Sequence, residues 1–84
     1  MNERRIGFVG AILEDREKSH IAVNEVLAAN HSIILARMGL PRQGGTAAVI
    51  TLVVDATTDE LGALTGRLGN IPGVTVKSGL ATKG

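Results

Sequence analysis

The sequence predicts an α+β domain in which two helices cover one face of a four-stranded antiparallel sheet. Three observations support this. The apolar pattern divides the chain in the order strand, helix, strand, strand, helix, strand. Helix-start signals follow the first and third strand-like segments, at Asp15 and Thr57. Two split βαβ units with right-handed crossovers give this architecture. We expect residues 1–84 to form a single domain with an ordered core over about residues 5–81.

The first strand is expected over Arg5–Leu13, and the first helix follows it directly. Asp15 is a capping residue, and the charge of Glu17 suits the positive end of the helix dipole. Apolar residues then recur at helical spacing as far as about Ala29. Asn30 is predicted to end this helix in the left-handed backbone conformation.

The middle of the chain contains two strands separated by a loop. The segment Ser32–Met38 has strand character, and Gly39–Gly45 is the most loop-like segment of the sequence. The third strand is expected over about Thr46–Ala56. These two strands therefore form a hairpin.

A capping box marks the start of the second helix. Thr57 is followed three residues later by Glu60, the spacing at which each side chain caps the other residue's backbone amide. Leucines then recur at helical spacing, and Gly69 is a natural stop. After a Pro-Gly turn, Val74–Ser78 is the fourth strand. The leucines of this helix are Leu61, Leu64 and Leu68.

Two of the predicted strands are apolar on both faces. A strand with one face in water should alternate apolar with polar residues, since successive side chains point in opposite directions. The third strand instead places Val49 and Val53 on one face and Ile50, Leu52 and Val54 on the other. The helices cover only one face, so we predict that a second copy covers the other, in a homodimer or homotetramer. Edge-to-edge pairing into a longer sheet is the alternative geometry.

Composition excludes several function classes. Apolar residues make up 44% of the chain and the mean hydropathy is +0.22, which is typical of a globular domain. Phe8 is the only aromatic residue, so platforms for stacking nucleic-acid bases are absent. A net charge of +1 gives no electrostatic case for autonomous nucleic-acid or membrane binding. The lack of cysteine, of a signal-peptide pattern and of a long apolar run favours a cytoplasmic location.

Five charged residues are candidates for ligand binding. Glu14 and Asp15 cluster with Glu17 at the end of the first strand, where these carboxylates could receive a cationic ligand or a metal, and Arg16 lies between them in the sequence. Helix capping is the alternative explanation for Asp15. Arg37 and Arg42 could hold a carboxylate or phosphate together with the backbone amides of the glycine-rich loop. The alternative is that Arg37 and Arg42 are isolated surface arginines that bind no ligand.

No catalytic set or metal-binding motif is recognisable. His20 and His31 are the only histidines, and they could bind a metal only by pairing across a symmetric interface. The alternative is an exposed helix residue and a helix-end residue that contacts terminal carbonyls. The serines lack a histidine and an acid at a recognisable spacing. We therefore predict no enzyme activity, no cofactor and no metal.

Four segments resemble a known family, described as regulators of the iron-only hydrogenase system. They are Glu14–Lys18, Val23–Leu27, Ile34–Pro41 and, with the more specific motif, Leu61–Lys77. The resemblance covers nearly all of the chain. It implies a ferredoxin-like, ACT-like domain related in fold to the C-terminal domain of the nickel-responsive repressor. It also implies a homo-oligomer with a regulatory role.

Ligand sites known in related folds do not carry over to this sequence. The nickel-responsive repressor uses histidines and a cysteine, whereas this chain has no cysteine and no histidine in Ile33–Met38 or Ala47–Val54. Amino-acid-binding ACT domains commonly place a glycine after the first strand, and Leu13–Arg16 has none. The segment Met1–Arg5 is too short for the repressor's DNA-binding element.

The sequence thus predicts a non-enzymatic, homo-oligomeric regulatory module, acting on transcription or on the hydrogenase system. A small ligand or a protein partner would bind it at a subunit interface. The alternative is a structural or assembly protein whose sheet face docks a larger enzyme.

Overall fold

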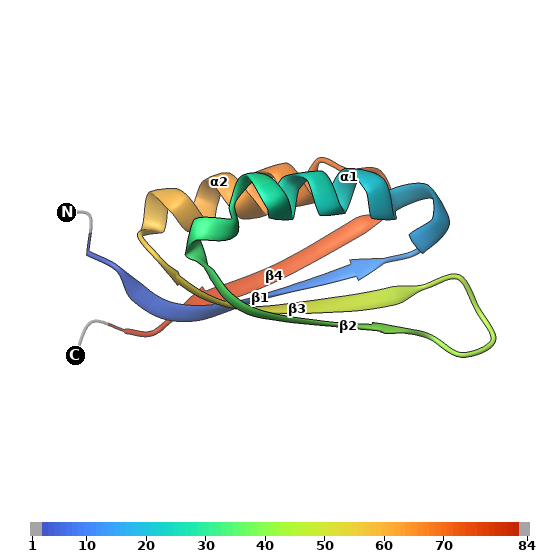
Figure 1. Ribbon diagram of the computed structural model, residues 1–84, viewed down its shortest axis with the longest axis horizontal. Helices are drawn as coiled ribbons and strands as arrows, with labels where there is room; N and C mark the ends of the chain where they lie inside the picture. The colour runs from blue at the N-terminus through green and yellow to red at the C-terminus, as the bar shows by residue number, and fades with distance from the viewer. Residues whose placement is uncertain (1–2, 83–84) are drawn as a thin grey trace.

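Two helices lie on the same side of one four-stranded antiparallel sheet (Figure 1). The structure is a computed structural model that describes residues 3–82, so the expected domain limits at residues 1 and 84 lie outside it. The strand order is β2-β3-β1-β4, which confirms the predicted α+β architecture. The elements are β1 (Arg5–Leu13), α1 (Arg16–Ala29), β2 (Ile34–Pro41), β3 (Ala48–Ala56), α2 (Thr58–Gly69) and β4 (Val74–Leu80).

The core lies between the helices and the sheet face beneath them. Alternate residues of β1 and β3 point toward the helices, where their side chains are almost fully buried. Each helix adds two buried aliphatic side chains at helical spacing. Burying one such side chain contributes about 1.5–3 kcal/mol. The largest fully buried side chains are Val9, Leu13, Val23, Leu52, Val54, Leu64 and Leu68.

Helix α1 begins as predicted but ends differently. The Asp15 carboxylate accepts a hydrogen bond of 3.1 Å from the backbone amide of Glu17, which confirms its capping role. The prediction of a left-handed Asn30 is wrong, because its φ is −116°. A short 3₁₀ turn, His31–Ile33, follows Asn30 directly, so the chain leaves the helix without a residue in the left-handed conformation. Instead, the Asn30 side-chain amide donates to the Val26 carbonyl over 2.8 Å.

The β2–β3 hairpin is longer than the sequence indicates. Strand β2 continues through Gly39 and Leu40 to Pro41, residues that we assigned to the loop, while β3 begins at Ala48. Antiparallel pairing with β3 holds this segment extended, as in the pair Leu40 and Val49. A proline is tolerated here because β2 is an edge strand, where one side of the backbone needs no partner.

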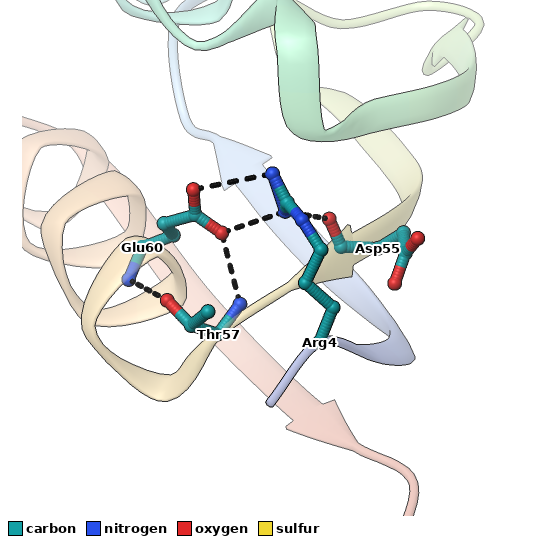
Figure 2. A network of polar contacts seen from close by, with 4 residues as sticks. All are labelled: Arg4, Asp55, Thr57 and Glu60. Carbon is teal, nitrogen blue, oxygen red and sulfur yellow. Dashed lines mark hydrogen bonds and ion pairs between the residues drawn. The ribbon is translucent and has the colours of Figure 1, made fainter. Parts of the chain in front are cut away.

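Figure 2 shows the capping box that starts α2. The Thr57 hydroxyl accepts from the Glu60 amide over 3.1 Å, and the Glu60 carboxylate accepts from the Thr57 amide over 2.9 Å. Arg4 extends this network with an ion pair of 2.8 Å to Glu60 and a hydrogen bond of 3.1 Å to the Asp55 carbonyl. The predicted capping box is confirmed, and it also links the residue before β1 to α2.

Candidate interaction surface and ligand groove

The sheet face turned away from the helices, which we call the open face, includes three aligned rows of side chains, and the pair formed by Ile6 of β1 and Asp55 of β3 continues it beyond the first row. Each row crosses all four strands, because residues paired in an antiparallel sheet point to the same side. Among these twelve residues Lys77, at the β4 edge, is the only charged one. In the order β2, β3, β1, β4 the rows are Ala36, Val53, Phe8 and Gly79; Met38, Thr51, Gly10 and Lys77; and Leu40, Val49, Ile12 and Thr75.

The open face presents large aliphatic and aromatic side chains to solvent. Phe8 on the inner strand β1 is 52% exposed, and Met38 on the edge strand β2 is 62% exposed. The Phe8 ring lies against Gly79, where an added Cβ would come within 3.0 Å of the ring. A monomer rarely leaves so continuous an apolar surface uncovered, since burial of such a surface drives association. The remaining large apolar residues of this face, each 38–63% exposed, are Ile6, Ile12, Leu40, Val49 and Val53.

A shallow hollow of about 420 Å³ lies where the open face meets the β2–β3 loop. Ile12, Leu40 and Val49 of the open face line it together with Arg42. Arg42 therefore belongs to the hairpin end of the molecule. Its backbone amide donates to the Ala47 carbonyl over 2.8 Å, which closes the loop.

A groove separates α1 from β2 on the helix side of the sheet. It consists of two hollows of about 320 and 290 Å³ that both include Asn24 and Arg37 in their walls. The Arg37 guanidinium donates to the Asn24 side-chain oxygen over 3.1 Å and so forms a bridge between the two hollows. Nearly all of β2 is solvent-exposed, because β2 is the sheet edge beside α1. We call this feature the α1–β2 groove.

Two further basic groups of the groove are oriented by backbone carbonyls. Arg16 donates from one terminal nitrogen to the carbonyl of Gly45 over 2.9 Å and to that of Ala47 over 3.3 Å. His20 Nδ1 lies 3.0 Å from the Arg16 carbonyl, one helical turn earlier. These contacts connect the start of α1 to the β2–β3 loop at one end of the groove.

The structure brings together two of the five predicted ligand-binding residues. Arg16 and Arg37 line the same hollow of the α1–β2 groove. Arg42 lines the separate hollow beside the open face. Asp15 caps α1, and the backbone of Glu14 donates to the Gly73 carbonyl over 2.9 Å, so both belong to the connection between β1 and α1. Ligand binding by these five residues stays a prediction.

Asn24 is a groove residue that is not among the five predicted ones, although the sequence contains a usable signal for it. Arg16, His20 and Asn24 follow one another at intervals of four residues, which places them along one face of α1. Their side chains face β2 and contribute to the groove. Only the tertiary structure shows that Arg37 lies opposite this stripe.

The histidines occupy separate positions along the helix side. His31 Nδ1 lies 3.0 Å from the Ala28 carbonyl, as the helix-end interpretation predicts. Within residues 3–82, no group of three or more histidine and acidic side chains is placed to hold a metal ion. The helices in this part of the chain are also too short or too polar to cross a lipid bilayer.

The strand order, the helix placement and the uncovered sheet face define a small ferredoxin-like α+β domain. Its residues 5–78 match the family described as "Iron-only hydrogenase system regulator, putative", and the chain belongs to that family. This finding confirms the resemblance seen in the sequence. No curated protein matches the chain.

Solved structures support the same assignment. The uncharacterized protein TM1266 from Thermotoga maritima is 40% identical, with a TM-score of 0.89, and the match covers 95% of this chain and 100% of that one. The C-terminal domain of the MgtC protein from Mycobacterium tuberculosis is 17% identical, with a TM-score of 0.71 over 93% of this chain and 88% of that one. SnoaB, a cofactor-independent oxygenase from Streptomyces nogalater, is 12% identical, with a TM-score of 0.59 over 95% of this chain and 93% of that one. The last two likenesses show the fold alone.

Proposed function

We propose that this protein is a non-enzymatic regulatory module of the iron-only hydrogenase system and that it self-associates through its open face. The observation that carries the proposal is the continuity of that face. Three rows of side chains cross all four strands, and their single charged residue, Lys77, lies at the β4 edge, where a long side chain can reach solvent. The other charged residue of this face, Asp55, lies beyond the rows, at the end of β3. The family to which the chain belongs supports a regulatory role.

The size of the open face suits a second copy of the chain. Four strands of seven to nine residues span about 19 by 26 Å at ordinary strand spacing. Two stacked copies would therefore bury about 1,000 Å² of flat area, which is the lower limit for a specific interface, and side-chain relief adds to it. Two sheets stacked in this way pack about 10 Å apart, with their inner side chains interdigitated.

Regulation would follow from the geometry of that interface. A ligand or protein partner changes an assembly only if it binds one of two states more tightly. Self-association provides two such states. The open face is exposed in the free protomer and buried in the oligomer, so a ligand or partner can bind one state more tightly than the other. Docking of a larger enzyme on the same face is the alternative role, and it requires that this face remain free in the isolated protein.

Self-association can be tested with two substitutions of similar exposure on opposite sides of the molecule. Met38→Glu places a charge on the open face, and Ile21→Glu makes the same change on α1 at a residue that is 63% exposed. An unpaired charge buried in an apolar interface costs several kcal/mol. In sedimentation velocity, we expect a dimer or tetramer whose dissociation constant rises at least tenfold in Met38→Glu and changes less than twofold in Ile21→Glu.

A monomeric wild-type protein at millimolar concentration would overturn the proposal and favour docking of a larger partner. Equal effects of the two substitutions would show that association does not involve the open face. Circular dichroism of both variants checks that each one keeps the wild-type fold.

A further inference from the structure

The α1–β2 groove combines a basic lining with aliphatic walls. From this we infer that it binds a small organic anion that carries one carboxylate group on an aliphatic body. The inference rests on the proposed function in one respect, because this anion would be the small ligand of the regulatory module. The site itself lies on the helix side of the sheet, opposite the surface proposed for self-association.

Charge is the first observation. Every ionisable side chain that lines the two hollows is basic, although the chain contains nearly equal numbers of acidic and basic residues. The carboxylates of α1 lie outside the groove. An anion entering the groove therefore meets attraction from several sides and no nearby repulsion from its walls. The basic groups are Arg16, His20, His31 and Arg37.

The available hydrogen-bond donors are the second observation. A guanidinium carries five N–H donors in a planar fork that fits a carboxylate, and the side chain of Arg37 gives only one contact to Asn24. Arg37 is also solvent-exposed, so it can turn toward a ligand without breaking a buried contact. Arg16 is held more firmly by two loop carbonyls. We therefore place the carboxylate at Arg37, where the two hollows meet.

The apolar walls define the rest of the ligand. Leu27, Ile34 and Leu35 line one hollow, while Leu13, Pro41 and Ile50 contribute to the other. No aromatic side chain lines either hollow, and Phe8 lies on the opposite face of the sheet. A nucleotide base would find nothing to stack on. The two hollows, of about 320 and 290 Å³, lie at the lower limit of ligand-site volumes, which restricts the ligand to a compact branched aliphatic group.

Strand addition at the β2 edge fits the structure less well. The register of β2 shifts between Ile34 and Ala36, and Pro41 ends the strand. A bulge and a proline are two devices by which edge strands avoid pairing with another chain. A small anion in the groove requires no pairing with that edge.

Binding of 4-methylpentanoate to the full chain tests the inference, with its neutral amide 4-methylpentanamide as the matched control ligand. Titrations are followed by two-dimensional ¹H–¹⁵N NMR. We expect saturable shifts confined to α1 and β2, and an affinity for the carboxylate at least tenfold higher than for the amide. Arg37→Gln should weaken binding at least tenfold. Arg67→Gln removes the same charge from the exposed surface of α2 and should change affinity less than twofold.

Three results would overturn the inference. They are equal affinity for acid and amide, equal effects of the two arginine variants, and binding of inorganic phosphate as tight as that of the carboxylate. The last would show that the apolar walls contribute nothing. Sedimentation of the same samples separates this inference from the proposed function. Failure to bind with self-association intact contradicts only the groove, whereas binding by a monomeric wild-type protein contradicts only the assembly.

Discussion

At the scale of single residues, two glycines in the sheet occupy different environments. Gly7 of β1 lies where β4 crosses closely, and a Cβ added there would overlap the Gly79 carbonyl oxygen and approach the Leu80 side chain to 2.7 Å. Gly39 of β2 has more room, because a Cβ there would find its nearest atom, on Ile50, at 3.7 Å. The close approach of β4 therefore requires glycine at position 7, whereas position 39 has room for a larger residue.

We expect Gly7→Ala to lower the free energy of unfolding by about 1–3 kcal/mol, the usual cost of forcing extra atoms into a packed region. Gly39→Ala, which adds the same methyl group, should change it by less than about 0.5 kcal/mol. Urea unfolding followed by circular dichroism measures both. Equal stability of the two variants would mean that β1 and β4 are farther apart than the structure places them.

Roles that depend on neighbouring residues in the chain can be predicted from the sequence, whereas contacts between distant residues of the candidate site cannot. The capping role of Asp15 follows from local backbone geometry, so the sequence is sufficient to predict it. The meeting of Arg37 with Asn24 depends on how α1 lies beside β2, and no local pattern contains that information. The five predicted ligand residues thus divide among the groove, the hairpin end and the connection between β1 and α1.

At the scale of secondary-structure elements, the start of α2 is held by reciprocal contacts. Thr57 and Glu60 each satisfy the other's backbone amide, which would otherwise lack a partner at the helix start. Arg4 pairs with the same carboxylate, but the two side chains are 46% and 38% exposed. An ion pair in such an exposed position contributes little. The capping contacts therefore carry most of the stabilisation in this network.

Thr57→Ala is expected to lower the free energy of unfolding by about 1 kcal/mol, since it removes the hydroxyl that accepts from the Glu60 amide. Thr57→Ser keeps that hydroxyl and should retain most of the stability. Arg4→Ala should have a smaller effect than Thr57→Ala. Thermal unfolding of the three variants checks this order, and a larger loss in Arg4→Ala would contradict it.

Element boundaries show why part of the fold required the structure. The start of each helix was predictable from capping residues within a few positions of the chain. The end of β2 was not predictable in this way. The segment Gly39–Pro41 has the composition of a loop, but pairing with β3 keeps its backbone extended. Asn30 was assigned a left-handed conformation on residue type alone, whereas the path of the chain into the 3₁₀ turn decides its backbone angles.

At the scale of the whole molecule, the two proposed surfaces lie on opposite sides of one sheet. Strand β2 contributes to both, because Arg37 points to the groove and Met38, the next residue, points to the open face. A ligand that shifts β2 would change both surfaces together. Thermodynamic linkage then requires that self-association change ligand affinity by the same factor by which the ligand changes association.

The most direct test of the account is a search for contacts between copies of the chain. An equal mixture of ¹³C-labelled and unlabelled protein, examined by isotope-filtered NOE spectroscopy, reports only contacts between protomers. If the open face forms the interface, we expect intermolecular NOEs from the Phe8 ring and from the methyl groups of Ile12, Val49 and Val53. Intermolecular NOEs confined to the helices, or none at concentrations near one millimolar, would contradict it.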